Sequence, residues 1–201
     1  MRIMLVGATG TLGRAISQEL SSDCDIVSVA NRSGDYQVDL ADSASITALY
    51  QSVGAVDAVI CAAAHGGVIK PVEQMLRQDF LDSMKSKLLG QIDLVTQGIA
   101  CLGTEASFTL TTGLLNYQPI AKGAAAAMVN AAVEGFAHAA AIDMPARQRI
   151  NVISPALLQE SVEQYRGLFP GYLPVPAAIV AKAYRKAVLG RQNGAVIRVG
   201  W

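Results

Sequence analysis

The chain has 201 residues, a length typical of one domain that buries roughly 70% of its unfolded surface. Sixteen basic and sixteen acidic residues balance, so no basic surplus indicates binding to a nucleic acid or to an anionic membrane. No apolar run reaches the roughly 18 residues of a membrane span. Three scattered cysteines favour free thiols in a reducing cytoplasm over disulfides or a metal site.

The N-terminal stretch predicts a nucleotide-binding turn within a single domain over residues 1–201. An apolar strand at 3–6 runs into Gly7, Gly10 and Gly13, and an amphipathic helical pattern begins at once. Gly7 allows a tight turn, Gly10 lets a ligand approach the backbone, and Gly13 lets the helix lie close to the sheet. The spacing differs from the standard G-x-G-x-x-G, but the helix N-terminus suits a pyrophosphate. The alternative is a structural turn without a ligand.

The rest of the chain alternates strand-like and helix-like patterns. Strands are predicted at 26–30, 36–38, 56–61, 107–111, 150–153 (ended by Pro155) and 195–199, and helices after Asp42, at 80–100, at 123–142 and at 177–188, with a short one at Pro71. This order predicts an α/β fold, with a doubly wound, seven-stranded parallel sheet and helices on both faces. Ligands bind outside the carboxyl ends of such strands, so we expect one cleft lined by Gly7, Asn31, Ala62, Thr112 and Ser154.

The end of the second strand predicts which nicotinamide cofactor binds. An NAD site needs a carboxylate there, but the chain reads Asn31-Arg32-Ser33. A guanidinium and a hydroxyl suit a 2′-phosphate, which favours NADP (NADPH). Arg32 could instead be an ordinary surface residue, and Asp35 could contact the ribose if the turn has another shape. Asp39, which Leu40 follows, could accept from the adenine amino group, cap a helix or remain solvated.

Several segments in this order resemble the short-chain dehydrogenase/reductase family. They are the glycine turn, Asn31-Arg32-Ser33, Asp39-Leu40, Cys61-Ala62-Ala63-Ala64, Lys87-Leu88-Leu89-Gly90, residues 130–136, residues 149–155 and residues 194–199. The resemblance implies a single Rossmann domain, an NAD(P) cofactor, hydride transfer and oligomers. It also implies that the backbone after Pro155 holds the nicotinamide amide. The cofactor-binding residues expected are Gly7, Thr9, Gly10, Thr11, Leu12, Asn31, Arg32, Ser33, Asp39, Leu40, Ala62, Ala63, Ala64, Lys87, Pro155, Leu157 and Leu158.

The family's catalytic residues are mostly missing. The resemblance implies Ser, Tyr and Lys, usually with Asn, and alignment places Ala126 at the Tyr position, Asn130 at the Lys position and Lys87 at the Asn position. Thr112 keeps the role of the Ser, although Gly113 aligns there as well.

Other residues could replace the missing ones. Tyr117 is the first candidate for the proton donor and His65 the second, and for each the alternative is a loop residue without a catalytic role. Lys87 could orient the substrate, bind the ribose or pair with a carboxylate.

The helix predicted at 123–142 carries one polar stripe, Asn130, Glu134 and His138, and is otherwise apolar or small. Such a helix must be covered on more than one side, so we expect a partner subunit on the side away from the sheet. The resemblance implies a homodimer or homotetramer that forms through this helix and the helix at 80–100. We expect Glu134 and His138 to pair with each other or with solvent.

These observations predict an NADPH-dependent oxidoreductase that acts on a carbonyl or alcohol small molecule. A segment at 159–176, rich in aromatic and apolar residues, predicts an apolar pocket. The alternative function is a catalytically impaired NADPH-binding sensor or assembly module, because such a protein keeps the cofactor residues and can lose the Tyr and Lys.

Overall fold

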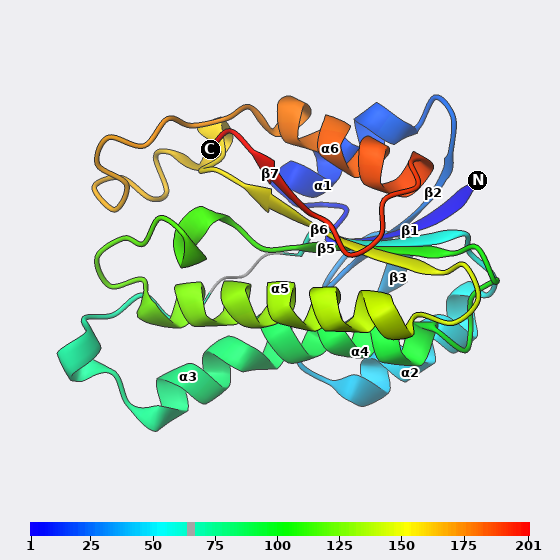
Figure 1. Cartoon of the computed structure of the whole chain (residues 1–201), viewed down its shortest axis with the longest axis horizontal. Coiled ribbons are helices and arrows are strands. Elements are labelled where there is room, and N and C mark those ends of the chain that lie inside the picture. The colour runs from blue at the N-terminus through cyan, green and yellow to red at the C-terminus, as the bar shows by residue number, and fades with distance from the viewer. Residues whose placement is uncertain (64–66) are drawn as a thin grey trace.

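A computed structural model describes residues 1–63 and 67–201. Its centre is one parallel sheet of seven strands in the order β3-β2-β1-β4-β5-β6-β7 (Figure 1). The strands are β1 (Arg2–Val6), β2 (Asp25–Ala30), β3 (Tyr36–Gln37), β4 (Ala58–Cys61), β5 (Ser107–Thr111), β6 (Arg149–Pro155) and β7 (Val196–Val199). The doubly wound fold predicted from the sequence is confirmed, and the strand order reverses between β1 and β4, where such sheets bind ligands.

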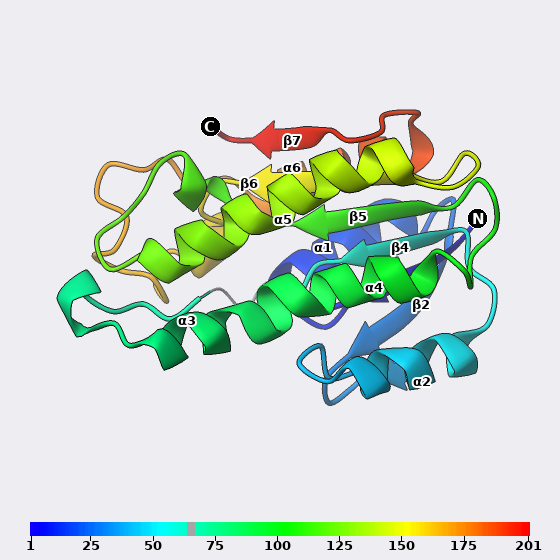
Figure 2. The same cartoon turned by 60° about the horizontal axis from the view of Figure 1, so that its bottom comes forward.

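Helices cover both faces of the sheet. On one face lie α1 (Thr11–Leu20) and α6 (Ala177–Leu189), and on the other lie α2 (Ser43–Val53), α4 (Gln91–Gly98) and α5 (Ala124–Asp143) (Figures 1 and 2). Each layer has its own apolar core, because successive strand residues point to opposite faces. Met4 and Val6 pack toward α2, α4 and α5, whereas Ile3 and Leu5 pack toward α1 and α6.

The helix predicted at 80–100 is built from three parts. It begins earlier than predicted, as α3 (Arg77–Met84), passes through a π-helical turn (Lys85–Gly90) and continues as α4. The side chain of Gln91 stabilises this turn, since its Nε2 donates to the Lys87 carbonyl at 2.7 Å and to the Thr111 carbonyl at 3.1 Å. Gln91 therefore fixes the turn against the end of β5. π-Helical turns of this kind are frequent at functional sites.

Candidate functional site

The glycine turn between β1 and α1 has the geometry that the sequence predicts. Gly7 adopts a φ of 86°, and a Cβ on Gly13 would lie 2.0 Å from the Gly7 carbonyl oxygen, so α1 packs tightly on the turn. A Cβ on Gly10 would meet only that same oxygen, at 3.4 Å, and no side chain caps α1. The space beside Gly10 and the uncapped N-terminus of α1 therefore fit a pyrophosphate.

A cleft of about 740 Å³ opens at the carboxyl ends of the strands. Most of the residues expected to bind the cofactor line it: Gly7, Thr9, Gly10, Thr11, Leu12, Asn31, Asp39, Leu40, Ala62, Ala63, Lys87, Pro155, Leu157 and Leu158. Ala64 lies outside the described residues. Ser154 was expected in the cleft, which is wrong: β6 continues through Pro155, and Ser154 is buried, with its carbonyl accepting from the Trp201 indole at 2.9 Å.

The end of β2 leaves Arg32 and Ser33 exposed beside the cleft-lining Asn31. Neither side chain is among the described residues that line the cleft. Asp35 turns back onto β2, where its carboxylate accepts from the Ser28 hydroxyl at 2.7 Å and the Ser28 amide at 2.8 Å. These hydrogen bonds, the hydroxyl's first, hold the pKa of Asp35 below its usual value. Asp35 is therefore not directed at a ribose.

The Asp39 carboxylate lines the cleft and also has a local role. Its Oδ1 accepts from the amide of Ala41 at 2.9 Å, which closes the turn before α2. The helix cap considered from the sequence is supplied by Asp42 and not by Asp39, whereas Asp39 is exposed beside the cleft.

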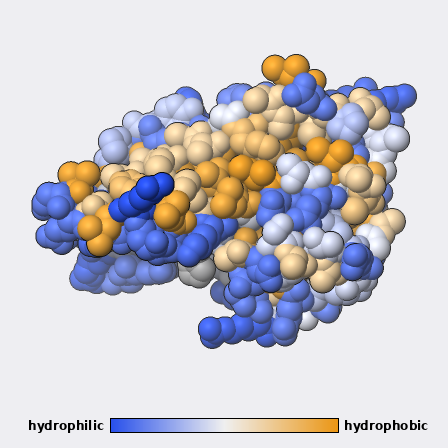
Figure 3. All heavy atoms as spheres, turned by 90° about the horizontal axis from the view of Figure 1, so that it is seen from below, coloured by the Kyte–Doolittle hydropathy of each residue, from blue (hydrophilic) through white to orange (hydrophobic). Residues whose placement is uncertain are grey.

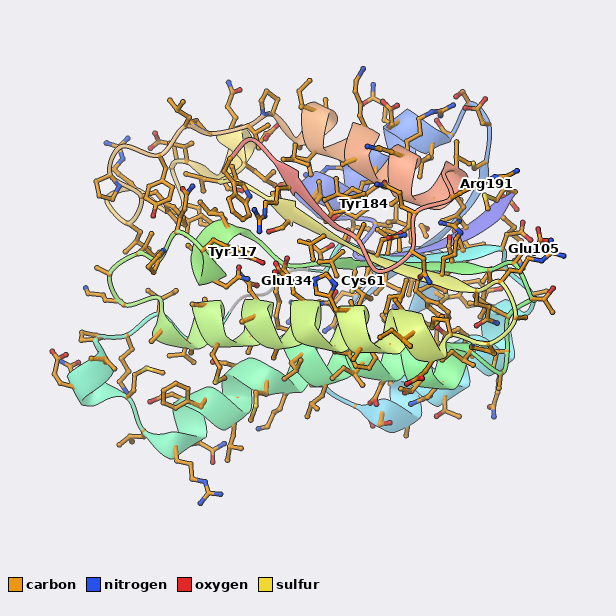
Figure 4. All side chains as sticks on the ribbon, in the orientation of Figure 1. Cys61, Glu105, Tyr117, Glu134, Tyr184 and Arg191 are labelled. Carbon is orange, nitrogen blue, oxygen red and sulfur yellow. The ribbon has the colours of Figure 1, made fainter. Side chains whose placement is uncertain are left out.

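At the inner end of the cleft, Thr112 is tied to a buried carboxylate. Its hydroxyl donates to Glu134 Oε1 at 3.0 Å, and Glu134 also accepts from Asn116 Nδ2 at 3.0 Å and from the Tyr117 hydroxyl at 2.8 Å (Figure 4). Glu134 is only 4% exposed, while His138 is exposed. The expectation that Glu134 pairs with His138 or with solvent was wrong, because the stripe of Asn130 and Glu134 faces the interior.

The Tyr117 side chain contacts Glu134, Trp201 and Arg198, none of which is among the described residues that line the cleft. Its hydroxyl is committed to Glu134, and its ring packs against Trp201, with centroids 5.2 Å apart, and under the Arg198 guanidinium at 4.2 Å. Tyr117 is not among the described residues that line the cleft. These contacts favour the alternative of a loop aromatic, and a catalytic role for Tyr117 stays a prediction. His65, the second candidate, lies outside the described residues.

We expect Tyr117→Phe to change the stability of the protein and not its turnover. The change removes one partly exposed hydrogen bond to Glu134, which keeps Thr112 and Asn116 as donors, so the free energy of unfolding should fall by about 1 kcal/mol. Urea unfolding measures this loss. A large fall in turnover at unchanged stability would contradict the position described for Tyr117.

Lys87 is a buried cation at the cleft. It comes from the π-helical turn, is 4% exposed, and its Nζ donates to the Thr112 carbonyl at 3.4 Å. Burial lowers the pKa of Lys87 to about 8, and the Cys61 thiol opposes this lowering only in part.

The positions aligned with the missing Tyr and Lys also face the cleft. Ala126 and Asn130 both line it from α5, one helical turn apart. Asn130 Nδ2 donates to the Gly113 carbonyl at 3.1 Å, so this amide and the Lys87 ammonium hold two successive carbonyls after β5. Neither side chain can transfer a proton to or from a substrate.

The segment at 159–176 supplies an apolar wall, as the sequence predicts. Tyr165, Leu168 and Phe169 line the cleft, whereas Tyr172 donates to the carbonyls of Gln118 and Pro119. A second group of apolar lining residues was missed from the sequence: these are Leu114, Leu115 and Ile120, from the loop between β5 and α5. The only signal for them was their apolar character just after the end of a predicted strand.

Comparison with known proteins shows which family model and which solved structures this chain resembles. A family model described as enoyl-(acyl carrier protein) reductase matches residues 7–191. The crystal structure of the protein lin1944 from Listeria innocua is similar, with 43% identity, a TM-score of 0.96 and 98% of each chain covered. A small-chain dehydrogenase in complex with NADPH has the same fold at 23% identity, with a TM-score of 0.86 over 99% of this chain and 96% of that one.

A curated relative, the short-chain dehydrogenase/reductase ucsE from Acremonium sp, is 34% identical over 92 residues, or 45% of this chain. The match spans only about a third of that relative's length, 34%.

Proposed function

Because the chain belongs to the short-chain dehydrogenase/reductase family, we propose that this oxidoreductase uses NADPH to reduce a small carbonyl compound, or to oxidise the corresponding alcohol. The observation that carries the proposal is the continuous cleft, which runs from the uncapped N-terminus of α1 at Gly10 to Thr112 and Lys87 at the end of β5. A cleft lined in this way suits a dinucleotide with its pyrophosphate at Gly10 and a substrate beside Thr112.

NADPH is favoured over NADH by the side chains at the end of β2. The Asp35 carboxylate is hydrogen-bonded to Ser28. The side chains of Arg32 and Ser33 are exposed and lie where we expect the 2′-phosphate of NADPH. A guanidinium binds such a phosphate through charge-assisted hydrogen bonds. One structure with the same fold is a small-chain dehydrogenase in complex with NADPH, which is consistent with this choice.

In the proposed reaction, bound NADPH supplies the hydride. The Thr112 hydroxyl donates its hydrogen bond to Glu134, so it can only accept a hydrogen bond from a ligand. The apolar walls formed by Leu114, Ile120 and Phe169 exclude water from the inner end of the cleft and favour an apolar substrate. A sensor without turnover remains the second candidate, because Ala126 stands where the family has its Tyr.

We expect NADPH to bind about 30- to 1000-fold more tightly than NADH, because two charge-assisted contacts contribute roughly 2–4 kcal/mol. Arg32→Ala should reduce this preference by roughly 5- to 30-fold and leave the NADH affinity unchanged. Fluorescence titration of the purified protein with both nucleotides measures these values. Arg191→Ala is the control, because Arg191 is an exposed arginine in the loop between α6 and β7 and is not among the described residues that line the cleft. Equal affinities in the wild type would contradict the choice of NADPH.

Turnover is tested by oxidation of NADPH against a panel of aldehydes, ketones and diketones. Reduction of at least one of these compounds would support the proposal that the protein is an enzyme. Tight NADPH binding without any reduction would favour the sensor instead.

We also propose that the protein is a homodimer or homotetramer that assembles through α4 and α5. Figure 3 shows apolar residues gathered on this side of the molecule. Leu89, in the turn before α4, is 49% exposed, and Ile142, in α5, is 86% exposed. Val129, Val133 and Ala137 of α5 pack inward, yet its outward side is also apolar. By length and composition α5 could even cross a membrane, and a second protein surface would account for that composition equally well.

Ala131→Glu is expected to weaken the proposed assembly, because Ala131 lies on the exposed side of α5 and a buried charge without a partner is costly. Ala178→Glu, on the exposed side of α6 and on the opposite face of the sheet, is the matched control. Analytical ultracentrifugation at micromolar concentration measures both. A monomeric wild-type protein would contradict the proposal.

A further inference from the structure

Lys87 is a buried cation whose charge has no ionic partner. In residues 1–63 and 67–201, no carboxylate lies within 4.0 Å of its Nζ, and Glu134, on the neighbouring helix, is occupied by three other donors. An ammonium has three N–H groups, and the only acceptor found for them in this part of the chain is the Thr112 carbonyl at 3.4 Å. A buried charge kept with so few partners is costly to the fold, which indicates a use at the cleft.

The backbone around Lys87 is held rigidly. Gln91 donates to the Lys87 carbonyl at 2.7 Å and accepts from the Thr111 amide at 2.8 Å, so the π-helical turn is fastened to the end of β5. Gly90 lets the turn pack closely on the Leu40 loop, since a Cβ there would lie 2.3 Å from the Leu40 carbonyl oxygen. The backbone of Lys87 is thus held in place, and its side chain lines the cleft beside Thr112.

The side chains beside Lys87 at the end of β5 offer no proton to transfer. The Thr112 hydroxyl donates to Glu134. The Asn130 amide donates to the Gly113 carbonyl with one of its two N–H groups and is not an acid. Ala126 has no polar atom. Of these four residues, Lys87 has both N–H donors to spare and a transferable proton.

We infer that Lys87 is the catalytic proton donor of this enzyme, and that its ammonium contacts the carbonyl oxygen of the substrate beside Thr112. This inference rests on the proposed function. The carbonyl carbon accepts a hydride with its electron pair from NADPH, which becomes NADP⁺, and the π bond to oxygen breaks. The oxygen takes a proton from Lys87 Nζ, which leaves an alcohol and a neutral amine, and the amine regains a proton from water.

The reaction should depend on pH through Lys87. The titratable groups around it are Cys61 on β4, whose own pKa burial raises to about 11, and Glu134 on α5, which reaches it through Thr112. Reduction requires the protonated amine, so kcat/KM should be constant below pH about 8 and fall tenfold per pH unit above it. Alcohol oxidation, which requires the neutral amine, should show the opposite trend.

Lys87→Met tests the inference with an apolar side chain of similar length that removes the buried charge without leaving a cavity. With NADPH and 1-phenyl-1,2-propanedione, an apolar aromatic diketone, we expect kcat/KM to fall about 10²-fold while the NADPH affinity changes less than about threefold. Lys87→Arg should keep part of the activity but lose its decline at alkaline pH. Lys85→Met is the matched control, because Lys85 lies in the same turn, is exposed and pairs with Asp82, and it should behave as the wild type.

A second measurement does not depend on turnover. Benzoate presents an anionic oxygen to the NADP⁺-loaded protein, and Lys87→Met should weaken its binding by about tenfold or more. Unchanged kcat/KM in Lys87→Met, where the wild type is active, would overturn the inference alone. So would a parallel loss of NADPH affinity, which would make Lys87 a cofactor ligand.

If the wild type binds NADPH but reduces no carbonyl of the panel, the proposed function fails, and the catalytic role of Lys87 fails with it. The benzoate titration then decides whether Lys87 faces a ligand oxygen at all. Equal benzoate affinity in the wild type and in Lys87→Met, or no binding to either, would overturn that contact as well.

Discussion

Gly10→Val is expected to weaken NADPH binding by about 10²–10⁴-fold while the protein remains folded. The backbone at Gly10 is extended, with φ −75° and ψ 170°, a conformation that valine adopts readily. A Cβ there meets only the Gly7 carbonyl oxygen, at 3.4 Å, so the added methyl groups enter the cleft. They would occupy the space proposed for the pyrophosphate and remove roughly 3–6 kcal/mol of charge-assisted hydrogen bonds.

Two variants make this experiment specific. Gly103→Val is the control, because Gly103 has no atom within 4 Å of a built Cβ and lies in a loop away from the cleft, and it should bind NADPH normally. Gly13→Val should instead prevent folding, since its Cβ would lie 2.0 Å from a backbone oxygen. Circular dichroism and nucleotide titration separate the two effects. A folded Gly10→Val protein with normal NADPH affinity would show that the phosphates bind elsewhere.

Introducing the Tyr and Lys expected from the family resemblance, as Ala126→Tyr and Asn130→Lys, is expected to raise carbonyl reduction by about 10²-fold, the lower end of the range for a well-placed general acid. Both positions line the cleft on one side of α5, so a phenol at 126 and an ammonium at 130 would face the same substrate. The gain stays at the lower end because Lys87, in our proposal, already supplies a proton.

The matched control is Ala126→Phe with Asn130→Lys, which has the same bulk and charge without the hydroxyl. It should show no gain, and it also reveals any loss that comes from breaking the Asn130 hydrogen bond to Gly113. Steady-state kcat/KM with the same diketone measures all variants. Equal activity of the Tyr and Phe versions would mean that a proton donor at 126 is out of reach of the substrate.

Much of the fold could be predicted from the sequence because its signals are local. Alternating apolar strands and helices predict a parallel sheet, and the glycines predict the tight turn at Gly7 and the close packing of α1 at Gly13. The π-helical turn at Lys85–Gly90 could not be predicted. It depends on the hydrogen bonds that Gln91 makes with β5, a contact between segments that lie apart in the sequence.

The catalytic end of the cleft was harder to predict for the same reason. Tyr117 comes shortly after β5, which indicated a position in the cleft, but the loop carries its hydroxyl to Glu134 instead. The helical spacing of Asn130 and Glu134 was visible, but periodicity shows only that two residues share a face of a helix and not what covers that face. Only the structure shows that this face is covered, because Glu134 is buried and hydrogen-bonded to Thr112.

Trp201 gives the molecule a built-in optical reporter. It is the only tryptophan of the chain, and its indole donates to the Ser154 carbonyl, one residue before the cleft-lining Pro155. Its ring also packs against Tyr117, which is hydrogen-bonded to Glu134 and through it to Thr112. Emission excited at the red edge of the indole band therefore comes from one known position, and a change in the loop that carries Tyr117 can be followed in solution without any attached dye.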